Sequence, residues 1–234
     1  KTTDALIGSA FGSAGERCMA ISVAVCVGKK TAENLKTKLL EETLKLNVGP
    51  YTDEKSDFGP LNNKAHYEKV MGYIDTGEKE GAKLLSDGRN MKLQGYENGY
   101  FVGPTIFEDV KPDMKIYKEE IFGPVLSMMT TDTYEEALKL VNDHELGNGA
   151  AVFTKSGMIA KHFTENAKIG MIGVNVPIPV PVAYHSFGGW KRSLFGDHSM
   201  HGPEGVRFYT KLKTATVTWS EDNSGPEFTI PVLS

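Results

Sequence analysis

The sequence lacks several features that would place it quickly in a class of protein. Its 234 residues include only two cysteines, Cys18 and Cys26, and neither their number nor their spacing suggests a framework of disulfides. Lysine and arginine number 26 against 30 aspartates and glutamates, so no basic excess can neutralise a phosphate backbone or an anionic membrane surface. We therefore expect two free thiols, no nucleic-acid partner and no membrane partner.

Long apolar runs are missing as well. No run approaches the roughly 20 residues that a bilayer-spanning helix needs, and residues 1–17 lack the charged start and apolar middle of a signal peptide. We expect a cytoplasmic protein, or one of the mitochondrial matrix if the source is eukaryotic. With 40% apolar and 24% charged residues, the chain has the composition of a domain that buries a sizeable core.

The order of strand-like and helix-like segments indicates the fold class. Strands are predicted at residues 21–27, 83–85, 101–107, 121–129, 150–153 and 169–174. Helices are predicted at residues 31–46 with Thr31 as N-cap, 63–80, 133–141 with Thr133 as N-cap, and 158–167. This alternation predicts an α/β fold, a largely parallel sheet with flanking helices, in which ligands bind at the carboxyl ends of the strands.

The end of the chain has a different pattern. Val206 to Trp219 alternates β-forming residues with lysine and threonine, as an exposed strand does, and Ser220–Pro226 is turn-like. We predict a thiol-bearing domain over residues 1–205 and a C-terminal β arm and tail over residues 206–234. An arm with an open strand edge favours pairing with another copy, as in a homodimer or homotetramer.

Cys18 is the candidate nucleophile. A thiol attacks as thiolate, which needs local positive charge, and Arg17 is its direct neighbour just past a helix that Gly15 can end. A small buried cysteine in an alanine- and glycine-rich stretch is the alternative that these residues alone leave open. Cys26, among isoleucine, valine and alanine, should instead be buried and unreactive, with a raised pKa.

Two other patterns are weaker. Gly8, Gly12 and Gly15 do not match the G-x-G-x-x-G fingerprint and follow no strand, so we expect helix packing there and no phosphate-binding turn. His198 and His201 have i, i+3 spacing, but no cysteine or carboxylate cluster completes a metal site, and nearby glycine and proline indicate a loop. We expect no metal.

Five longer segments occur in an order known from one enzyme superfamily. They are GSAFGSAGERCMA (8–20), GPLNNKAHYEKVMGYIDTGEKEGAKLL (59–85), GYFVGPTIFEDV (99–110), KEEIFGPVLSM (118–128) and SFGGWKRS (186–193). In these segments, of which EEIFGPV is the most specific, the chain resembles the aldehyde dehydrogenase superfamily. Arg17 before the cysteine, residues 169–191 and SLFGD (193–197) resemble its coenzyme A-acylating branch, the methylmalonate-semialdehyde dehydrogenases.

The resemblance implies an activity and a nucleophile. Members of this branch convert malonate or methylmalonate semialdehyde, with NAD and coenzyme A, to acetyl- or propionyl-coenzyme A and carbon dioxide. Cys18 takes the place of the residue that forms a thiohemiacetal, loses hydride to nicotinamide and becomes a thioester. Coenzyme A then accepts the acyl group.

Roles for further residues also follow from the resemblance. Glu120 matches the glutamate that holds the nicotinamide ribose hydroxyls, and Phe122 matches an aromatic beside the nicotinamide ring. His66 and Lys69 lie where other members place further ribose contacts, although a place on a helix surface explains them equally well. Phe187 matches a residue that lines the aldehyde pocket.

Arg17 offers a basis for substrate choice. The semialdehydes carry a carboxylate, and a guanidinium beside the nucleophile can bind it while the aldehyde meets the thiol. A surface arginine at a helix end is the alternative.

Members of the superfamily are about twice as long as this chain. The N-terminal Rossmann cofactor domain and the oxyanion-hole asparagine of the family would lie upstream of Lys1, so we expect a catalytic half that is inactive alone. The first residue, lysine and not methionine, favours a piece of a longer enzyme. A non-catalytic, self-associating module is one alternative. A hydrolytic semialdehyde dehydrogenase, for example one acting on succinate semialdehyde, is the other.

Overall fold

The computed structural model describes residues 1–217 and residue 219. The helices are α1 (Thr2–Phe11), η1 (Gly12–Gly15, a 3-10 turn), α2 (Lys29–Thr43), α3 (Lys64–Lys79), α4 (Lys115–Lys118), α5 (Tyr134–Asp143), α6 (Gly157–Asn166) and α7 (Pro203–Tyr209). The strands are β1 (Val23–Val27), β2 (Lys83–Ser86), β3 (Thr105–Glu108), β4 (Val125–Thr131), β5 (Leu146–Gly147), β6 (Gly149–Val152), β7 (Met171–Val174) and β8 (Trp190–Lys191).

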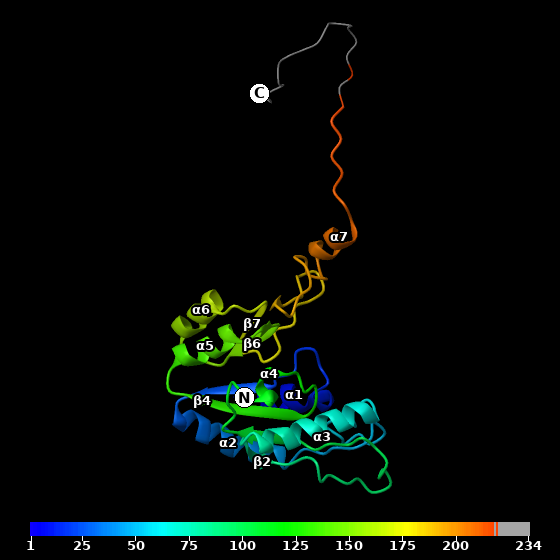
Figure 1. Cartoon of the computed structure of the whole chain (residues 1–234), viewed down its shortest axis with the longest axis vertical. Coiled ribbons are helices and arrows are strands. Elements are labelled where there is room, and N and C mark those ends of the chain that lie inside the picture. The colour runs from blue at the N-terminus through cyan, green and yellow to red at the C-terminus, as the bar shows by residue number, and fades with distance from the viewer. Residues whose placement is uncertain (218, 220–234) are drawn as a thin grey trace.

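A four-stranded sheet forms the centre of the fold, in the order β1-β4-β3-β2. Its strands β1, β4 and β3 are parallel, and only β2 runs antiparallel, at the edge. In Figure 1, α2 and α3 lie along one side of this sheet, and α5 and α6 lie with β6 and β7 on the other. The predicted α/β fold with a largely parallel sheet is confirmed.

Two apolar cores hold the layers together. The larger core includes fully buried side chains from helices and sheet, among them Leu39, Val70, Ile74, Ile106, Phe107 and Leu126. The smaller one, around Phe163 and Ile169, packs α5 and α6 against the parallel pair β6 and β7. Since full burial of one such side chain contributes about 1.5–3 kcal/mol, these cores are the main source of stability.

Local sequence signals explain most helix boundaries. Asn63 caps α3 by accepting a hydrogen bond from the His66 amide at 2.9 Å, and Thr133 and Glu136 form a reciprocal capping box at the start of α5. The predicted first residue and cap of α2 were wrong. The helix begins at Lys29 behind Gly28, whose φ of 84° suits glycine, so Thr31 lies inside the first turn and is not its cap.

Two strands begin later than predicted. The strand expected at 121–129 begins at Val125, because Phe122 has a left-handed backbone (φ 59°) and Pro124 has no amide hydrogen to donate. The strand expected at 101–107 begins at Thr105. Gly103 before it packs against Gly88 so closely that a Cβ on Gly88 would lie 1.8 Å from the Gly103 carbonyl oxygen.

The C-terminal region differs from its prediction. Residues 206–209, expected at the start of an exposed strand, belong to α7, which begins at Pro203, a residue that favours the first helical turn. This helix crosses the predicted boundary between residues 205 and 206. Beyond it, residues 210–217 form no helix or strand and extend away from the body of the molecule (Figure 1). The turn expected at Ser220–Pro226 lies outside the described residues.

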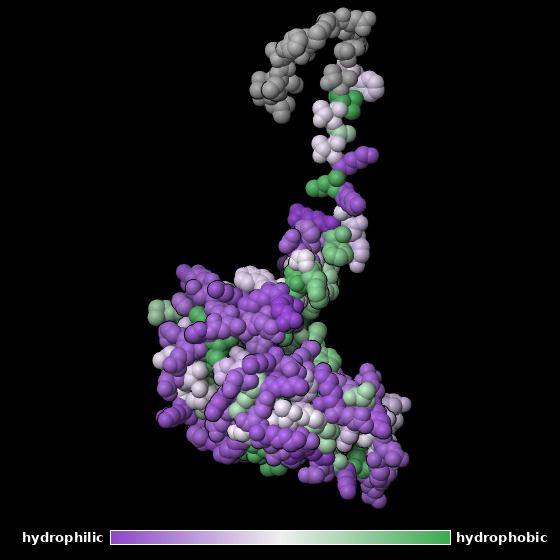
Figure 2. Space-filling view, in the orientation of Figure 1, coloured by the Kyte–Doolittle hydropathy of each residue, from purple (hydrophilic) through white to green (hydrophobic). Residues whose placement is uncertain are grey.

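Apolar side chains are exposed both on the loops that lead from β7 to α7 and on the segment beyond α7. Figure 2 shows green, apolar groups between the body and α7 and on the stretch beyond it. The exposed residues include Val176, Val180, Val182, Tyr184, Phe195, Met200, Phe208, Leu212 and Trp219. Within the described part of the chain, every helix is too short or too polar to cross a bilayer.

Candidate functional site

Cys18 lies in an open turn between α1 and β1, here called the thiol turn (residues 12–18). Ser13 and Ala14 (φ 55° each) and Gly15 (φ 71°) have left-handed backbones, which end the helix and reverse the chain. The Cys18 side chain is exposed at the end of this turn, as a nucleophile must be, and is a free thiol. The predicted position of Cys18 just past a helix end is therefore confirmed.

Cys26 has the opposite environment. It lies in β1 with 4% of its surface exposed, and burial raises the pKa of its thiol to about 11. At neutral pH almost none of it is thiolate. The expectation that Cys26 belongs to the core with a raised pKa is confirmed.

Two residues next to β6 support the thiol turn. The Asn148 side-chain amide donates a hydrogen bond to the Cys18 carbonyl oxygen at 3.0 Å. Met19 is buried beside Gly149, where an added Cβ would lie 2.2 Å from the Met19 terminal methyl carbon. Asn148 was not among the predicted site residues, because an Asn-Gly pair before a strand gives no indication of a contact 130 residues upstream.

Arg17 lies in the thiol turn, and its guanidinium reaches back to the last turn of α1. Its guanidinium is exposed, and Nη1 donates to the Gly8 carbonyl oxygen at 3.5 Å, the limit of a hydrogen bond. The negative end of the helix dipole favours a cation at this place. This is the one hydrogen bond of the guanidinium within residues 1–217, so most of its donors face solvent beside the thiol turn.

A second segment carries the residues expected to meet the cofactor. Glu120 and Phe122 lie between α4 and β4, and helix α3 holds their backbone with two side chains one turn apart. Lys69 Nζ donates to the Glu120 carbonyl oxygen at 3.2 Å, and His66 Nε2 lies 2.6 Å from the Phe122 carbonyl oxygen. The Glu120 carboxylate is exposed and has no hydrogen bond from the residues that the structure describes.

The thiol turn and this segment are in direct contact. A Cβ on Gly15 would lie 2.1 Å from the Gly123 carbonyl oxygen, so only glycine permits the approach. Beside this contact, Glu16 Oε1 lies 3.3 Å from His66 Nε2. The fold therefore brings together segments that are about a hundred residues apart in the sequence.

Phe187 lies apart from these contacts, in the loop before β8. It is half-buried, and its ring centroid lies 5.2 Å from that of His201. Its neighbours Ser186, Gly188 and Gly189 line a cavity of about 440 Å³. His198 pairs with Glu204 at 2.5 Å, so the two histidines considered for a metal face different partners.

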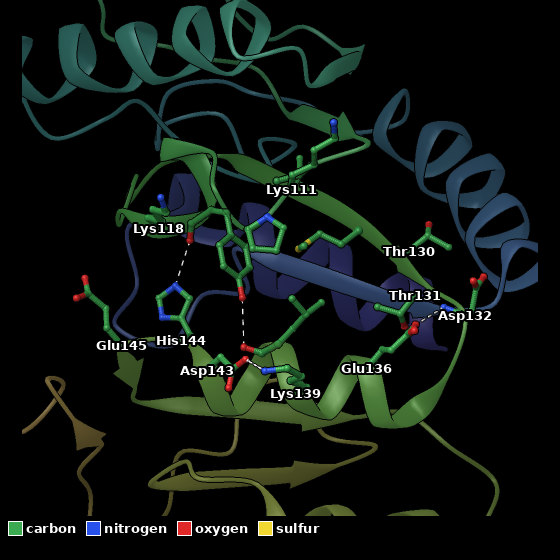
Figure 3. Close-up of a pocket in the computed structure, with 15 residues that line it drawn as sticks. Lys111, Lys118, Thr130, Thr131, Asp132, Glu136, Lys139, Asp143, His144 and Glu145 are labelled. Carbon is green, nitrogen blue, oxygen red and sulfur yellow. Dashed lines mark hydrogen bonds and ion pairs between the residues drawn. The ribbon is translucent and has the colours of Figure 1, made fainter.

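A larger cavity of about 870 Å³ lies between α4, β4 and α5 (Figure 3). Tyr117 Oη donates to the Leu140 carbonyl oxygen at 3.3 Å across it, His144 contacts the Tyr117 carbonyl oxygen, and Lys139 pairs with Asp143. None of the predicted site residues lines this cavity. The candidate site is therefore the exposed surface around Cys18 and Glu120.

The sequence and the fold match one enzyme family. Residues 1–215 match the model of the aldehyde dehydrogenase family, and the chain belongs to that family. Among curated relatives, it is 53% identical over 98% of its length to the malonate-semialdehyde dehydrogenase of Pseudomonas aeruginosa. It is 48% identical over 99% of its length to the mitochondrial acylating methylmalonate-semialdehyde/malonate-semialdehyde dehydrogenase of Bos taurus.

Solved structures show the same likeness. The methylmalonate-semialdehyde dehydrogenase of Oceanimonas doudoroffii superposes with a TM-score of 0.91 at 52% identity over 94% of this chain and 45% of that one. A mutant aldehyde dehydrogenase C of Pseudomonas syringae, in complex with NAD⁺ and octanal, superposes with a TM-score of 0.80 at 31% identity, over 88% of this chain and 41% of that one. The chain spans about half the length of the curated relatives, 46% and 43% for the two named above.

Proposed function

We propose that this chain is the thiol-bearing half of an NAD-dependent, coenzyme A-acylating dehydrogenase of malonate or methylmalonate semialdehyde. The observation that carries the proposal is the exposed Cys18, next to Arg17, at the point where the thiol turn meets the Glu120–Phe122 segment. Family membership and the names of the relatives support it.

Cys18 performs the covalent chemistry in this proposal. Its thiolate adds to the aldehyde carbon and forms a carbon–sulfur bond, which gives a thiohemiacetal. The hydrogen on that carbon leaves with its electron pair as hydride, the hydroxyl proton is lost, and a thioester remains on Cys18. The bond between the α-carbon and the substrate carboxylate breaks, carbon dioxide leaves, and a proton adds to the α-carbon. The thiol of coenzyme A then takes the acyl group, and its proton passes to the Cys18 sulfur, which is freed.

Glu120 and Phe122 fit the nicotinamide end of NAD, which accepts the hydride when it is bound. An exposed carboxylate with free oxygens suits the two ribose hydroxyls. The half-buried Phe122 lies next to Gly123, which touches the thiol turn, so its ring is suited to pack beside nicotinamide. Lys69, bonded to the Glu120 carbonyl oxygen, serves the cofactor by holding Glu120 in place.

Arg17 and Phe187 select the substrate in this proposal. The solvent-facing N–H groups of Arg17 bind the carboxylate of the semialdehyde in a fork, next to the thiol that takes its aldehyde end. Phe187 contributes an apolar surface to the aldehyde pocket. Together they favour short aldehydes that carry an acid group.

Exposed apolar residues between Val176 and Trp219 support self-association, so we propose a homo-oligomer, a dimer or a tetramer. They also keep a second candidate function open, in which the isolated chain is a non-catalytic, self-associating module. A hydrolytic dehydrogenase, releasing the free acid, is the third candidate.

One assay separates the three candidates. The longer enzyme that this proposal requires, in which a nucleotide-binding half precedes the chain, is given malonate semialdehyde and NAD with or without coenzyme A, and NADH and acetyl-coenzyme A are measured. Acetyl-coenzyme A as the product supports the proposal, and free acid with no need for coenzyme A supports the hydrolytic enzyme. The chain alone should form no NADH and show no micromolar affinity for NAD by calorimetry. If neither the chain alone nor the longer enzyme turns over substrate, the result supports the non-catalytic, self-associating module.

A further inference from the structure

His66 occupies the place where three segments of the site meet. Its ring nitrogen Nε2 lies 2.6 Å from the Phe122 carbonyl oxygen and 3.3 Å from Glu16 Oε1. One neighbour belongs to the segment that carries Glu120, and the other is two residues before Cys18. His66 itself lies in the first turn of α3, where its amide donates to the Asn63 cap.

The chemistry of these contacts fixes the direction of the hydrogen bonds. A carbonyl oxygen and a carboxylate oxygen only accept, so Nε2 must carry a hydrogen and donate it. The side chains of His66 and Glu16 are only 16% and 17% exposed, which strengthens a polar contact between them and makes an unpaired Glu16 costly. Glu16 Oε1 also accepts from the Asn62 amide at 3.3 Å, just before the cap of α3.

A geometric constraint accompanies these contacts. Phe122 has a left-handed backbone, which is uncommon for a bulky residue and persists only where its surroundings hold it. The His66 hydrogen bond acts on the carbonyl of this same residue, and the next residue, Gly123, touches Gly15 of the thiol turn. The ring of His66 also lies edge-on to that of Phe122, with centroids 6.1 Å apart.

We propose that His66 and Glu16 form a positioning pair that fixes the thiol turn against the Glu120–Phe122 segment. In this arrangement His66 acts through the backbone, since it holds the Phe122 carbonyl and the Glu16 side chain and leaves the reacting atoms to Cys18. The inference rests on the proposed function, because the distance it controls matters to a hydride transfer between the two segments. A loosened pair lowers the rate of that step more than it weakens aldehyde binding.

Amide hydrogen exchange in the chain tests the pair without any need for activity. We expect His66→Ala to speed exchange about 3- to 30-fold both in residues 13–18 and in residues 119–123, since it removes hydrogen bonds to both. His66→Gln places an amide donor near the position of Nε2 and should restore most of the protection. Glu68→Ala, an exposed change on the same helix, is the control and should leave both segments unaltered.

Glu16→Ala extends the test. It should speed exchange in residues 13–18, and the variant with both changes should exchange there no faster than His66→Ala, because the pair is already broken. Faster exchange confined to α3, additive effects of the two changes, or no rescue by glutamine would overturn the proposal.

Kinetics of the proposed longer enzyme supply an independent readout. His66→Ala should lower kcat about 10- to 100-fold and leave the KM for the aldehyde within about twofold, since orientation and not substrate binding is lost. If exchange responds as expected and the enzyme oxidises no semialdehyde, the pair stands and the proposed function fails. If the enzyme is active and His66→Ala leaves both exchange and kcat unchanged, the pair fails alone.

Discussion

The two cysteines of this chain, eight residues apart, have nearly opposite properties. Cys18 is exposed at the end of a turn with left-handed backbone, beside an arginine. Cys26 is enclosed in a parallel strand, opposite Thr130 in the register of β1 and β4, and burial raises its pKa. The fold exposes one thiol and buries the other, so residue type alone does not predict which of the two can react.

The largest effect expected from this comparison is on catalysis. In the longer enzyme that we propose, Cys18→Ser should lower kcat for malonate semialdehyde by several orders of magnitude, because a serine hydroxyl without an activating base is a poor nucleophile. Cys26→Ser is the matched control. It should leave kcat nearly unchanged and lower the free energy of unfolding by about 1–3 kcal/mol, because it buries a hydroxyl. Retained oxidation in the Cys18 variant would remove the nucleophile assignment.

Alkylation compares the thiols directly. At pH 8, with a pKa of about 11, only about one Cys26 thiol in a thousand is ionised, and its surface is closed to reagents. Brief treatment of the folded chain with iodoacetamide should therefore label Cys18 before Cys26, as read by peptide mapping. Labelling in urea, where both sites are open, provides the control. Preferential modification of Cys26 in the folded chain would contradict the comparison.

Arg17 is the neighbour that distinguishes the surroundings of Cys18 in the sequence. Arg17→Leu in the proposed longer enzyme should raise the KM for malonate semialdehyde about 10- to 100-fold, which is the effect of losing a charge-assisted hydrogen bond. It should raise the KM for propanal much less, because propanal has no carboxylate. Arg17→Lys keeps the positive charge but cannot donate two parallel hydrogen bonds to a carboxylate. Its KM for malonate semialdehyde should lie between those of the unchanged enzyme and Arg17→Leu. Equal losses on both aldehydes would show that Arg17 does not bind the carboxylate.

Alkaline pH should reveal Cys26 as a stability effect. Its pKa rises from 9.0 to about 11 in the folded chain, so below pH 9 the thiol is neutral in both states. Between pH 9 and 11 only the unfolded state ionises, and the free energy of unfolding should fall by roughly 2–3 kcal/mol. Urea unfolding of the chain and of Cys26→Ala at several pH values isolates this component, as the difference between the two slopes. Parallel slopes would contradict the assignment.

Some patterns within one element predict it correctly, although Thr31 was not the cap that its position indicated. Asn63 and the Thr133–Glu136 box fix where α3 and α5 begin, and the run of β-branched residues around Cys26 indicates a strand. That strand was expected to be covered on both faces, but only Ala24 and Cys26 are buried and Val27 is exposed. These signals depend on neighbours in the chain, so they are visible without the fold. The resemblance of EEIFGPV and GERCMA to family motifs supplied Glu120 and Cys18 in the same way.

Contacts between distant segments were not predictable. The hydrogen bond from Asn148 to Cys18 and the contact between Glu16 and His66 depend on how α1, α3 and β6 pack together. The periodicity of the sequence does not indicate that packing. Residues from Val206 were expected to form a strand, but Val206 to Tyr209 belong to the helix α7, which begins at Pro203. Alternation of side chains alone does not decide between a strand and a helix at this place. Single hydrogen bonds between distant segments are therefore the part of the site that the sequence does not predict.

The register of the central sheet has a consequence for how the protein is made. β1 pairs with β4, and Val23 lies opposite Ser127. The hydrogen bonds between these two strands therefore cannot form until about a hundred further residues have been synthesised. At a synthesis rate of about 5–20 residues per second, the β1 segment spends roughly 5–20 s on a growing chain with no native partner. During that interval its apolar edge is open to other chains, and the growing chain is a natural client for a chaperone.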